Sequence, residues 1–218
     1  MSGILATLAA QAVCGFAWAL TGVRASWIGC VPEARPRVYF ANHNSHGDFV
    51  LIWSVLPRVL RAATRPVAGA DYWRKDAARR FLSEHVFHAV LIERDAQTRT
   101  IDPVQEMASA IDGGASLILF PEGTRNTTET RLLPFKSGLY HLASARPDIE
   151  CVPVWIENLN RVLPKGELIP IPLLCTVSFG APLMIEPDEP KDAFLHRARD
   201  AMLAIAPRDA APTPVDLT

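Results

Sequence analysis

Short apolar runs alternate with helix-like stretches along most of the chain, and this alternation constrains the fold more than any other feature. Six runs have the length and composition of buried strands: 37–41, 65–69, 87–93, 115–120, 150–156 and 173–179. Five stretches between and after them are typical of helices: 46–60, 71–85, 100–112, 137–145 and 190–205. Strands separated by helices predict an α/β fold with a mostly parallel central sheet flanked by helices.

The N-terminal segment has a different character, because residues 1–23 contain no charged side chain and 4–23 is mostly apolar. As a helix at ~1.5 Å per residue, this run is about 30 Å long, roughly one hydrocarbon thickness. Two placements stay open: a helix that lies in the interface or dips into one leaflet, and a helix that spans the bilayer. A buried core helix or a cleaved signal is less favoured, since no basic residue precedes the run. Arg24, Arg35 and Arg37 follow it, which predicts that the rest of the chain is cytoplasmic.

The sequence predicts three parts. Residues 1–30 form a membrane-associating helical segment, 31–206 form one globular domain that begins at a proline-rich joint, and 207–218 are expected to be disordered. A net charge of −1 gives no sign of a nucleic-acid partner. The four cysteines show no Cys-x-x-Cys spacing, which indicates free thiols in a reducing compartment.

A polar segment, residues 42–48, follows the first predicted strand and carries His43 and Asp48 five residues apart. A histidine at a strand end is suited to general base catalysis when a carboxylate one turn away fixes its tautomer. Ser45 and Asp48 also fit a helix capping box. With His46 added, the segment resembles half of a metal site, but the other histidines have no ligand spacing, which disfavours a metallohydrolase.

Four ordered blocks resemble the glycerolipid acyltransferase family, which includes bacterial 1-acylglycerol-3-phosphate acyltransferases. The blocks are Asn42-His43 with Asp48, Ile92-Glu93-Arg94, Phe120 to Arg125, and Val152-Pro153-Val154. Lys136 and Gly138 match the family pattern just after the third block, and the resemblance covers roughly residues 37–180. One position departs from the pattern: the family often has glycine about six residues before the second-block arginine, where this chain has His88.

The resemblance implies roles for particular residues. His43 would deprotonate an acceptor hydroxyl and Asp48 would orient its ring, with no serine or cysteine nucleophile. Consistent with this, the chain has no Gly-x-Ser-x-Gly elbow. The implied acceptor-binding residues are Arg94, Glu122, Gly123, Thr124, Arg125 and Lys136.

Within that set, Gly123 permits a tight turn and Arg125 offers a planar fork for phosphate. Glu122 is expected to position Arg125 or to contact the acceptor's hydroxyls. Taken alone, the third block would also fit a Pro-Gly turn with a surface ion pair.

The resemblance implies an acyltransferase of phospholipid biosynthesis. It would move a fatty acyl chain from acyl-CoA or acyl carrier protein to the free hydroxyl of 1-acylglycerol-3-phosphate (lysophosphatidic acid), giving phosphatidic acid. No metal or tightly held cofactor is implied, because the thioester is a co-substrate. The expected location is the cytoplasmic face of the bacterial inner membrane. Two alternatives stay open: another acceptor, either a lysophospholipid or a lyso-aminolipid, and a non-catalytic lipid-binding protein with the same fold.

A basic stretch with aromatic residues lies on one predicted helix. It comprises Tyr72, Trp73, Arg74, Lys75, Arg79 and Arg80. This composition fits a surface for anionic lipid head groups or for the phosphates of coenzyme A, and it also fits an ordinary solvated helix face.

Overall fold

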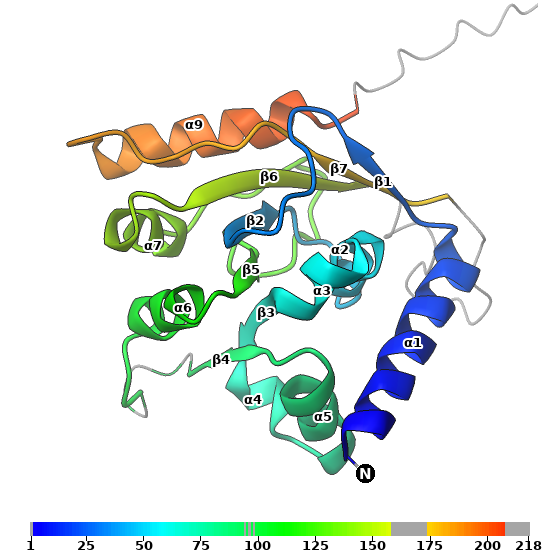
Figure 1. The fold of residues 1–218 in the computed structure, drawn as a ribbon. Helices are drawn as coiled ribbons and strands as arrows, with labels where there is room; N and C mark the ends of the chain where they lie inside the picture. The colour runs from blue at the N-terminus through cyan, green and yellow to red at the C-terminus, as the bar shows by residue number, and fades with distance from the viewer. Residues whose placement is uncertain (1, 94, 96, 98, 158–173, 208–218) are drawn as a thin grey trace, which may run out of the picture.

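The computed structural model describes residues 2–93, 95, 97, 99–157 and 174–207. Its strands are β1 (Arg24–Trp27), β2 (Arg37–Ala41), β3 (Thr64–Gly69), β4 (Val90–Ile92), β5 (Ser116–Leu119), β6 (Glu150–Glu157) and β7 (Thr176–Phe179). They form one sheet in the order β1-β7-β6-β2-β5-β3-β4, shown in Figure 1. All neighbours are parallel except β6 and β7, which are antiparallel.

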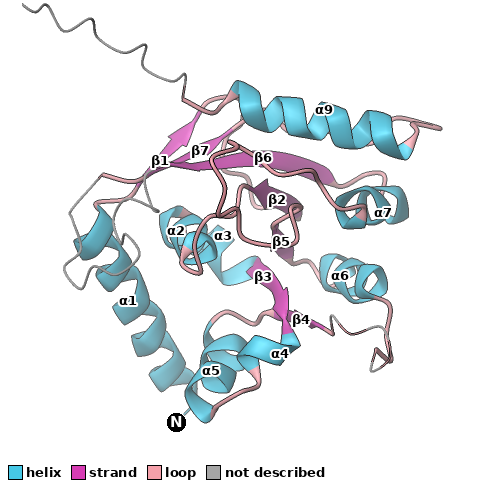
Figure 2. Ribbon diagram, turned by 180° about the vertical axis from the view of Figure 1, so that it is seen from behind, coloured by secondary structure: helices cyan, strands magenta, loops and turns pink. Residues whose placement is uncertain are grey.

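The helices are α1 (Ser2–Thr21), α2 (Asp48–Val55), α3 (Arg58–Ala63), α4 (Ala70–Trp73), α5 (Ala77–Phe81), the π-helix η1 (Leu82–Val86), α6 (Pro103–Asp112), α7 (Gly138–Ala145) and α9 (Lys191–Ala204). Helices α1, α2 and α3 lie on one face of the sheet, and α6, α7 and α9 cover the other (Figures 1 and 2). The predicted α/β fold, with a mostly parallel sheet flanked by helices, is therefore confirmed.

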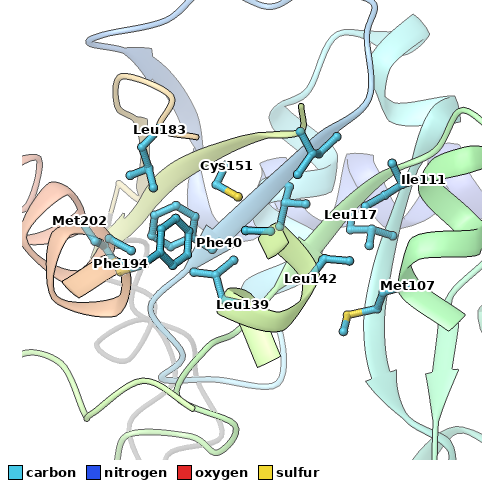
Figure 3. Close-up of a cluster of buried hydrophobic side chains, with 14 of the residues drawn as sticks. Phe40, Met107, Ile111, Leu117, Leu139, Leu142, Cys151, Leu183, Phe194 and Met202 are labelled. Atoms are coloured by element: carbon cyan, nitrogen blue, oxygen red, sulfur yellow. The ribbon is translucent and has the colours of Figure 1, made fainter. Parts of the chain in front are cut away.

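Strand β2 shows how the sheet divides the core into two layers. All five of its residues are buried, and successive side chains point to opposite faces. Val38 and Phe40 join the cluster under α6, α7 and α9, part of which Figure 3 shows. Tyr39 and Ala41 join the cluster under α1 and α2. A strand buried on both faces reads as a continuous apolar run, which is why its position was predictable.

Two predicted helices are broken in the structure. The stretch 46–60 becomes α2 and α3, because Leu56 precedes a proline and leaves the helical region with φ −64° and ψ 140°. The stretch 71–85 becomes α4, α5 and η1. Asp76 starts α5 by accepting a hydrogen bond from the backbone N–H of Arg79.

The N-terminal helix is tied directly to the sheet. Gly22 turns the chain after α1 with a φ of +52°, a conformation that favours glycine. Cys175, just before β7, donates its N–H to the carbonyl of Thr21 at 2.9 Å and accepts the N–H of Arg24 at 3.0 Å. Strand β1, which the sequence analysis did not expect, lies inside the predicted 1–30 segment.

Other parts of the sequence analysis have mixed outcomes. The four cysteines are free thiols, as predicted. The predicted tail lies outside the described residues except for its first residue. The division into three parts stays a prediction.

Candidate active site

The first and third blocks meet because β2 and β5 are parallel neighbours, with Phe40 opposite Leu119. Their carboxyl ends therefore lie at one edge of the sheet, and each runs into a polar loop. Ligands bind at this edge in open α/β sheets. The first loop carries His43 and the second carries Glu122.

His43 and Asp48 form a direct pair. The His43 Nδ1 lies 2.8 Å from Oδ2 of Asp48. The imidazole is partly buried and stacks on the ring of Phe120, with centroids 4.2 Å apart. Nε2 has no hydrogen-bond partner among the described residues. The ring is thus oriented through one nitrogen, and the other nitrogen is left for a substrate.

The Asp48 carboxylate is almost fully buried and also closes the loop. Its Oδ2 accepts the backbone N–H groups of Asn44 at 2.7 Å and Ser45 at 2.9 Å. The Ser45 hydroxyl accepts from Gly47 rather than from Asp48, so the reciprocal half of a capping box is not formed. One carboxylate oxygen therefore fixes both the loop backbone and the imidazole, while the buried Oδ1 has no partner in the described part of the chain.

Glu122 has a different role from the one expected. Its side chain is buried, with 1% exposure. Oε1 accepts the backbone N–H of His43 and Oε2 accepts that of Leu133, both at 2.8 Å. Burial raises the pKa of this carboxyl, while the two backbone N–H groups oppose that shift. The expected contact with Arg125 or with acceptor hydroxyls is replaced by contacts that join two loops.

Two asparagines also hold the site, and the sequence analysis assigned neither of them a structural role. The Asn42 side chain accepts the N–H of Ile156 at 2.7 Å and donates to its carbonyl at 3.1 Å, which anchors the end of β2 to β6. The backbone N–H of Asn126 donates to the His43 carbonyl at 2.6 Å. In the sequence, Asn42 was visible only as a member of the first block, and Asn126 only as a polar residue next to the third block.

The third block forms a tight turn beside a lysine. Gly123 has a φ of +69°, and its N–H donates to the Phe120 carbonyl at 3.0 Å. A Cβ at Gly123 would lie 3.1 Å from Cγ of Lys136, so the lysine side chain passes over the glycine. Thr124 and Arg125 are exposed.

Arg125 makes no ion pair or hydrogen bond within the described residues, but its charge reaches the His43 loop. Burial, followed by the charges of Arg125 and His43, lowers the pKa of His46. The structure therefore brings His43, Asp48, Glu122 and the third-block turn together, with Arg125 near His46. Arg94 lies outside the described residues.

A separate cavity of about 610 Å³ lies between α1, α3 and η1, and His88 is one of its lining residues. His88 has a φ of +48°, in the left-handed region that glycine favours. The chain thus keeps a glycine-like backbone at the position where it departs from the family pattern.

Comparison with known proteins identifies the family. A family model described as Acyltransferase matches residues 27–157. The chain belongs to the Acyltransferase family. The blocks at 42–48 and 120–125 both lie inside the matched region.

Its relatives include several 1-acyl-sn-glycerol-3-phosphate acyltransferases. The Cocos nucifera protein is 30% identical over 153 residues, which are 67% of this chain and 45% of that protein. The alpha form from Bos taurus is 29% identical over 192 residues, 85% of this chain and 64% of that protein. The Haemophilus influenzae protein is 29% identical over 137 residues, 57% and 51% of the two chains. This acyltransferase chain thus spans about half to two thirds of the length of these relatives.

The fold is also that of a solved structure. The crystal structure of the 1-acyl-sn-glycerophosphate acyltransferase from Thermotoga maritima matches with a TM-score of 0.69 at 18% identity. The match covers 90% of this chain and 76% of that one.

Proposed function

We propose that this acyltransferase moves a fatty acyl chain from acyl-CoA or acyl carrier protein to the free hydroxyl of lysophosphatidic acid. The observation that carries the proposal is the His43–Asp48 pair, with Nε2 unpaired among the described residues beside a loop that bears Arg125. The relatives named for the same reaction support this choice of acceptor.

In the proposed reaction, Nε2 of His43 accepts the proton of the acceptor hydroxyl as its oxygen attacks the thioester carbonyl carbon. The imidazolium is stabilised by the buried carboxylate of Asp48. The tetrahedral intermediate then collapses, the carbon–sulfur bond breaks, and the thiolate takes the proton from the imidazolium. His43 ends the cycle in its starting state, and general base catalysis of this kind contributes roughly 10²–10⁴-fold.

The cationic groups beside this pair support an anionic acceptor. Arg125 and Lys136 are exposed on the third-block side, and Gly123 brings the turn close to the lysine. We propose that they hold the acceptor's phosphate, with Thr124 at the same turn and Arg94 as the contact expected after β4. In lysophosphatidic acid, the phosphate is only a few bonds from the attacking oxygen, so its binding site has to lie near the base.

The faces of α1 support attachment to a membrane. Helix α1 is apolar and long enough to cross a membrane by length and composition, which by itself is weak evidence. Its small side chains, including Ala9 and Ala17, pack on the domain, while large ones, including Leu8, Phe16 and Trp18, are exposed. We therefore propose that α1 lies in the interface on the cytoplasmic face of the membrane, with the globular domain against it.

An acyl transfer assay on the purified full chain tests the function. The wild type, offered a panel of lysolipids with both acyl carriers, is expected to prefer lysophosphatidic acid. His43→Ala is expected to lose at least 10²-fold in kcat at a temperature where the variant is folded, because Nε2 accepts the hydroxyl proton. The loss of the Phe120 stacking and of the Asp48 contact should lower the unfolding midpoint only modestly.

The exposed His141 provides a matched control, since His141→Ala should retain full turnover. Near-normal turnover by His43→Ala would rule out the mechanism. Preference for a zwitterionic lysolipid would overturn only the acceptor, and the absence of turnover with every donor and acceptor would favour a lipid-binding protein.

A further inference from the structure

His46 and part of the basic stretch, which the proposed reaction does not use, form one stacked column. The His46 ring stacks on Tyr72 in α4, with centroids 5.4 Å apart and an angle of 10° between the planes. The guanidinium carbon of Arg79 in α5 lies 4.3 Å from the Tyr72 ring centroid on its face, a cation–π contact. Three segments thus build the series imidazole, phenol, guanidinium.

The column connects the loop that carries His43 with helix α5. His46 is three residues from His43, and burial together with the charges of Arg125, His43 and, less strongly, Arg79 lowers the pKa of His46 while Asp48 opposes the shift. Arg79 and His46 both contact the Tyr72 ring. The Nε of Arg79 contacts Asp76 at 3.2 Å, and its two terminal nitrogens have no partner among the described residues.

We propose that Arg79, supported by Tyr72 and His46, binds the phosphate of the acyl donor's phosphopantetheine arm. This deepens the proposed function and rests on it. When the acceptor attacks directly, donor and acceptor are bound together, so two phosphate sites are needed. The acceptor's phosphate must lie close to the base, whereas a long pantetheine arm separates the donor's phosphate from the thioester carbon. Arg79 lies on α5 and contacts Tyr72. Arg125 and Lys136 instead belong to the third-block side of the site, so we assign the donor's phosphate to Arg79.

The other cations of the basic stretch are less suited to this role. Arg74 uses a terminal nitrogen in its ion pair with Glu93, whereas the ion pair of Arg79 uses Nε. Lys75 is exposed and has no aromatic support among the described residues. Arg80 is exposed and has no aromatic support in the described part of the chain. Stacking matters because a guanidinium held on a ring presents a fixed fork to phosphate. The contacts therefore single out Arg79.

Donor kinetics test the proposal. Arg79→Gln is expected to raise the KM for acyl-CoA roughly 5- to 20-fold, the loss of one charge-assisted contact at a partly exposed site. Arg79→Gln should not change the KM for lysophosphatidic acid or kcat at saturating donor. It should also not change the rate with an acyl-N-acetylcysteamine thioester, because this donor has no phosphate. Acyl carrier protein distinguishes the source: a matching rise in its KM supports the shared phosphopantetheine phosphate, whereas no rise would assign Arg79 to the nucleotide phosphates of coenzyme A and overturn the proposal.

Two variants serve as controls. Arg80→Gln removes the same charge from the same helix and should leave the donor KM unchanged, while Tyr72→Leu removes the stacking platform and should reproduce part of the effect of Arg79→Gln. A larger rise in the lysophosphatidic acid KM, equal loss with the phosphate-free thioester, or no change in donor KM would each overturn the proposal.

Binding without turnover separates this proposal from the proposed function. In NMR titrations, coenzyme A should raise the pKa of His46, because an arriving anion offsets the repulsion from Arg125 and Arg79. Pantetheine, which has no phosphate, should not raise it, and neither should coenzyme A with Arg79→Gln. If the wild type binds coenzyme A in this way but transfers no acyl group, the proposed function is wrong and the phosphate site at Arg79 still stands. A His46 pKa that coenzyme A leaves unchanged would overturn the phosphate site.

Discussion

Glu122 contacts His43, the proposed general base, through the histidine's backbone and not through its side chain. Its two oxygens each accept one N–H, from His43 and Leu133, in a buried setting. A carboxylate is the only side chain of this length with two acceptor oxygens. The fixed position of the His43 loop therefore depends on the chemical type of Glu122 as much as on its size.

Glu122→Gln tests this dependence. The amide has one acceptor and one donor group, so one backbone N–H would face an NH₂ and stay unpaired. We expect the free energy of unfolding to fall by ~1–3 kcal/mol in urea titrations, and kcat to fall with it. Glu129→Gln, at an exposed position seven residues on, should change neither quantity. A Glu122→Gln variant with wild-type stability would contradict the proposed anchoring.

The local pattern at Asp48 was sufficient to predict its partner, because five residues and a helix start bring the two side chains together. The partners of Glu122 and His46 come from segments that are distant in the sequence, so spacing carried no information on them. The family resemblance assigned Glu122 to acceptor binding, whereas its side chain is buried and accepts two backbone N–H groups. His46 was set aside because the other histidines lack metal-ligand spacing, and its stacking on Tyr72 depends on where α4 lies.

At the scale of elements, the chain between η1 and β4 has an unusual backbone conformation. His88 has a φ of +48° where the family often has glycine. A side chain in this region costs about 1 kcal/mol, which glycine avoids, whereas a β-branched residue suffers more.

His88→Gly should therefore change the free energy of unfolding by less than about 1 kcal/mol, since relieved strain offsets the added freedom of the unfolded chain. His88→Val should lower it by about 1–2 kcal/mol. His85→Gly, inside η1, is the comparison and should cost about 1 kcal/mol. Equal losses in urea titrations of His88→Gly and His85→Gly would show that the backbone at residue 88 is not strained.

The central strands were predictable and the edge strand was not. Strands β2, β5 and β6 are continuous apolar runs, which reflect burial on both faces of the sheet. Strand β1 has four residues, two of them exposed, and exists through pairing with β7. Such a strand has no local signal, because the hydrogen bonds that define it come from a segment about 150 residues away.

At the scale of the whole molecule, α1 reverses the arrangement of an ordinary surface helix. Mostly small residues face the domain, together with Val13 and Leu20, while its aromatic residues and Leu8 are exposed, an arrangement suited to lipid and costly in water. Truncation of α1 would remove the buried Ala17 and Thr21 and would uncover the apolar cluster against which α1 packs, so substitution is the better test of attachment.

Replacement of Leu8, Phe16 and Trp18 together by Ser should lower partition into lipid vesicles at least ~10-fold, with little change in the unfolding midpoint, because these side chains are exposed. Met184→Ser removes an exposed apolar side chain outside α1 and should not affect partition. Unchanged flotation of the triple variant with vesicles would refute attachment through this face.

The backbone hydrogen bonds that Cys175 makes with Thr21 and Arg24 join the end of α1 directly to the sheet. A helix joined by a flexible linker would let the domain change its distance from the bilayer. This junction instead fixes the position of the sheet relative to α1. With α1 in the interface, its immersion depth sets the height of the His43 ring above the lipid. The enzyme would then select acceptors partly by the distance of their hydroxyl from the bilayer. A hydroxyl at the level of the glycerol backbone could reach His43, and one farther from the bilayer on a bulky head group could not.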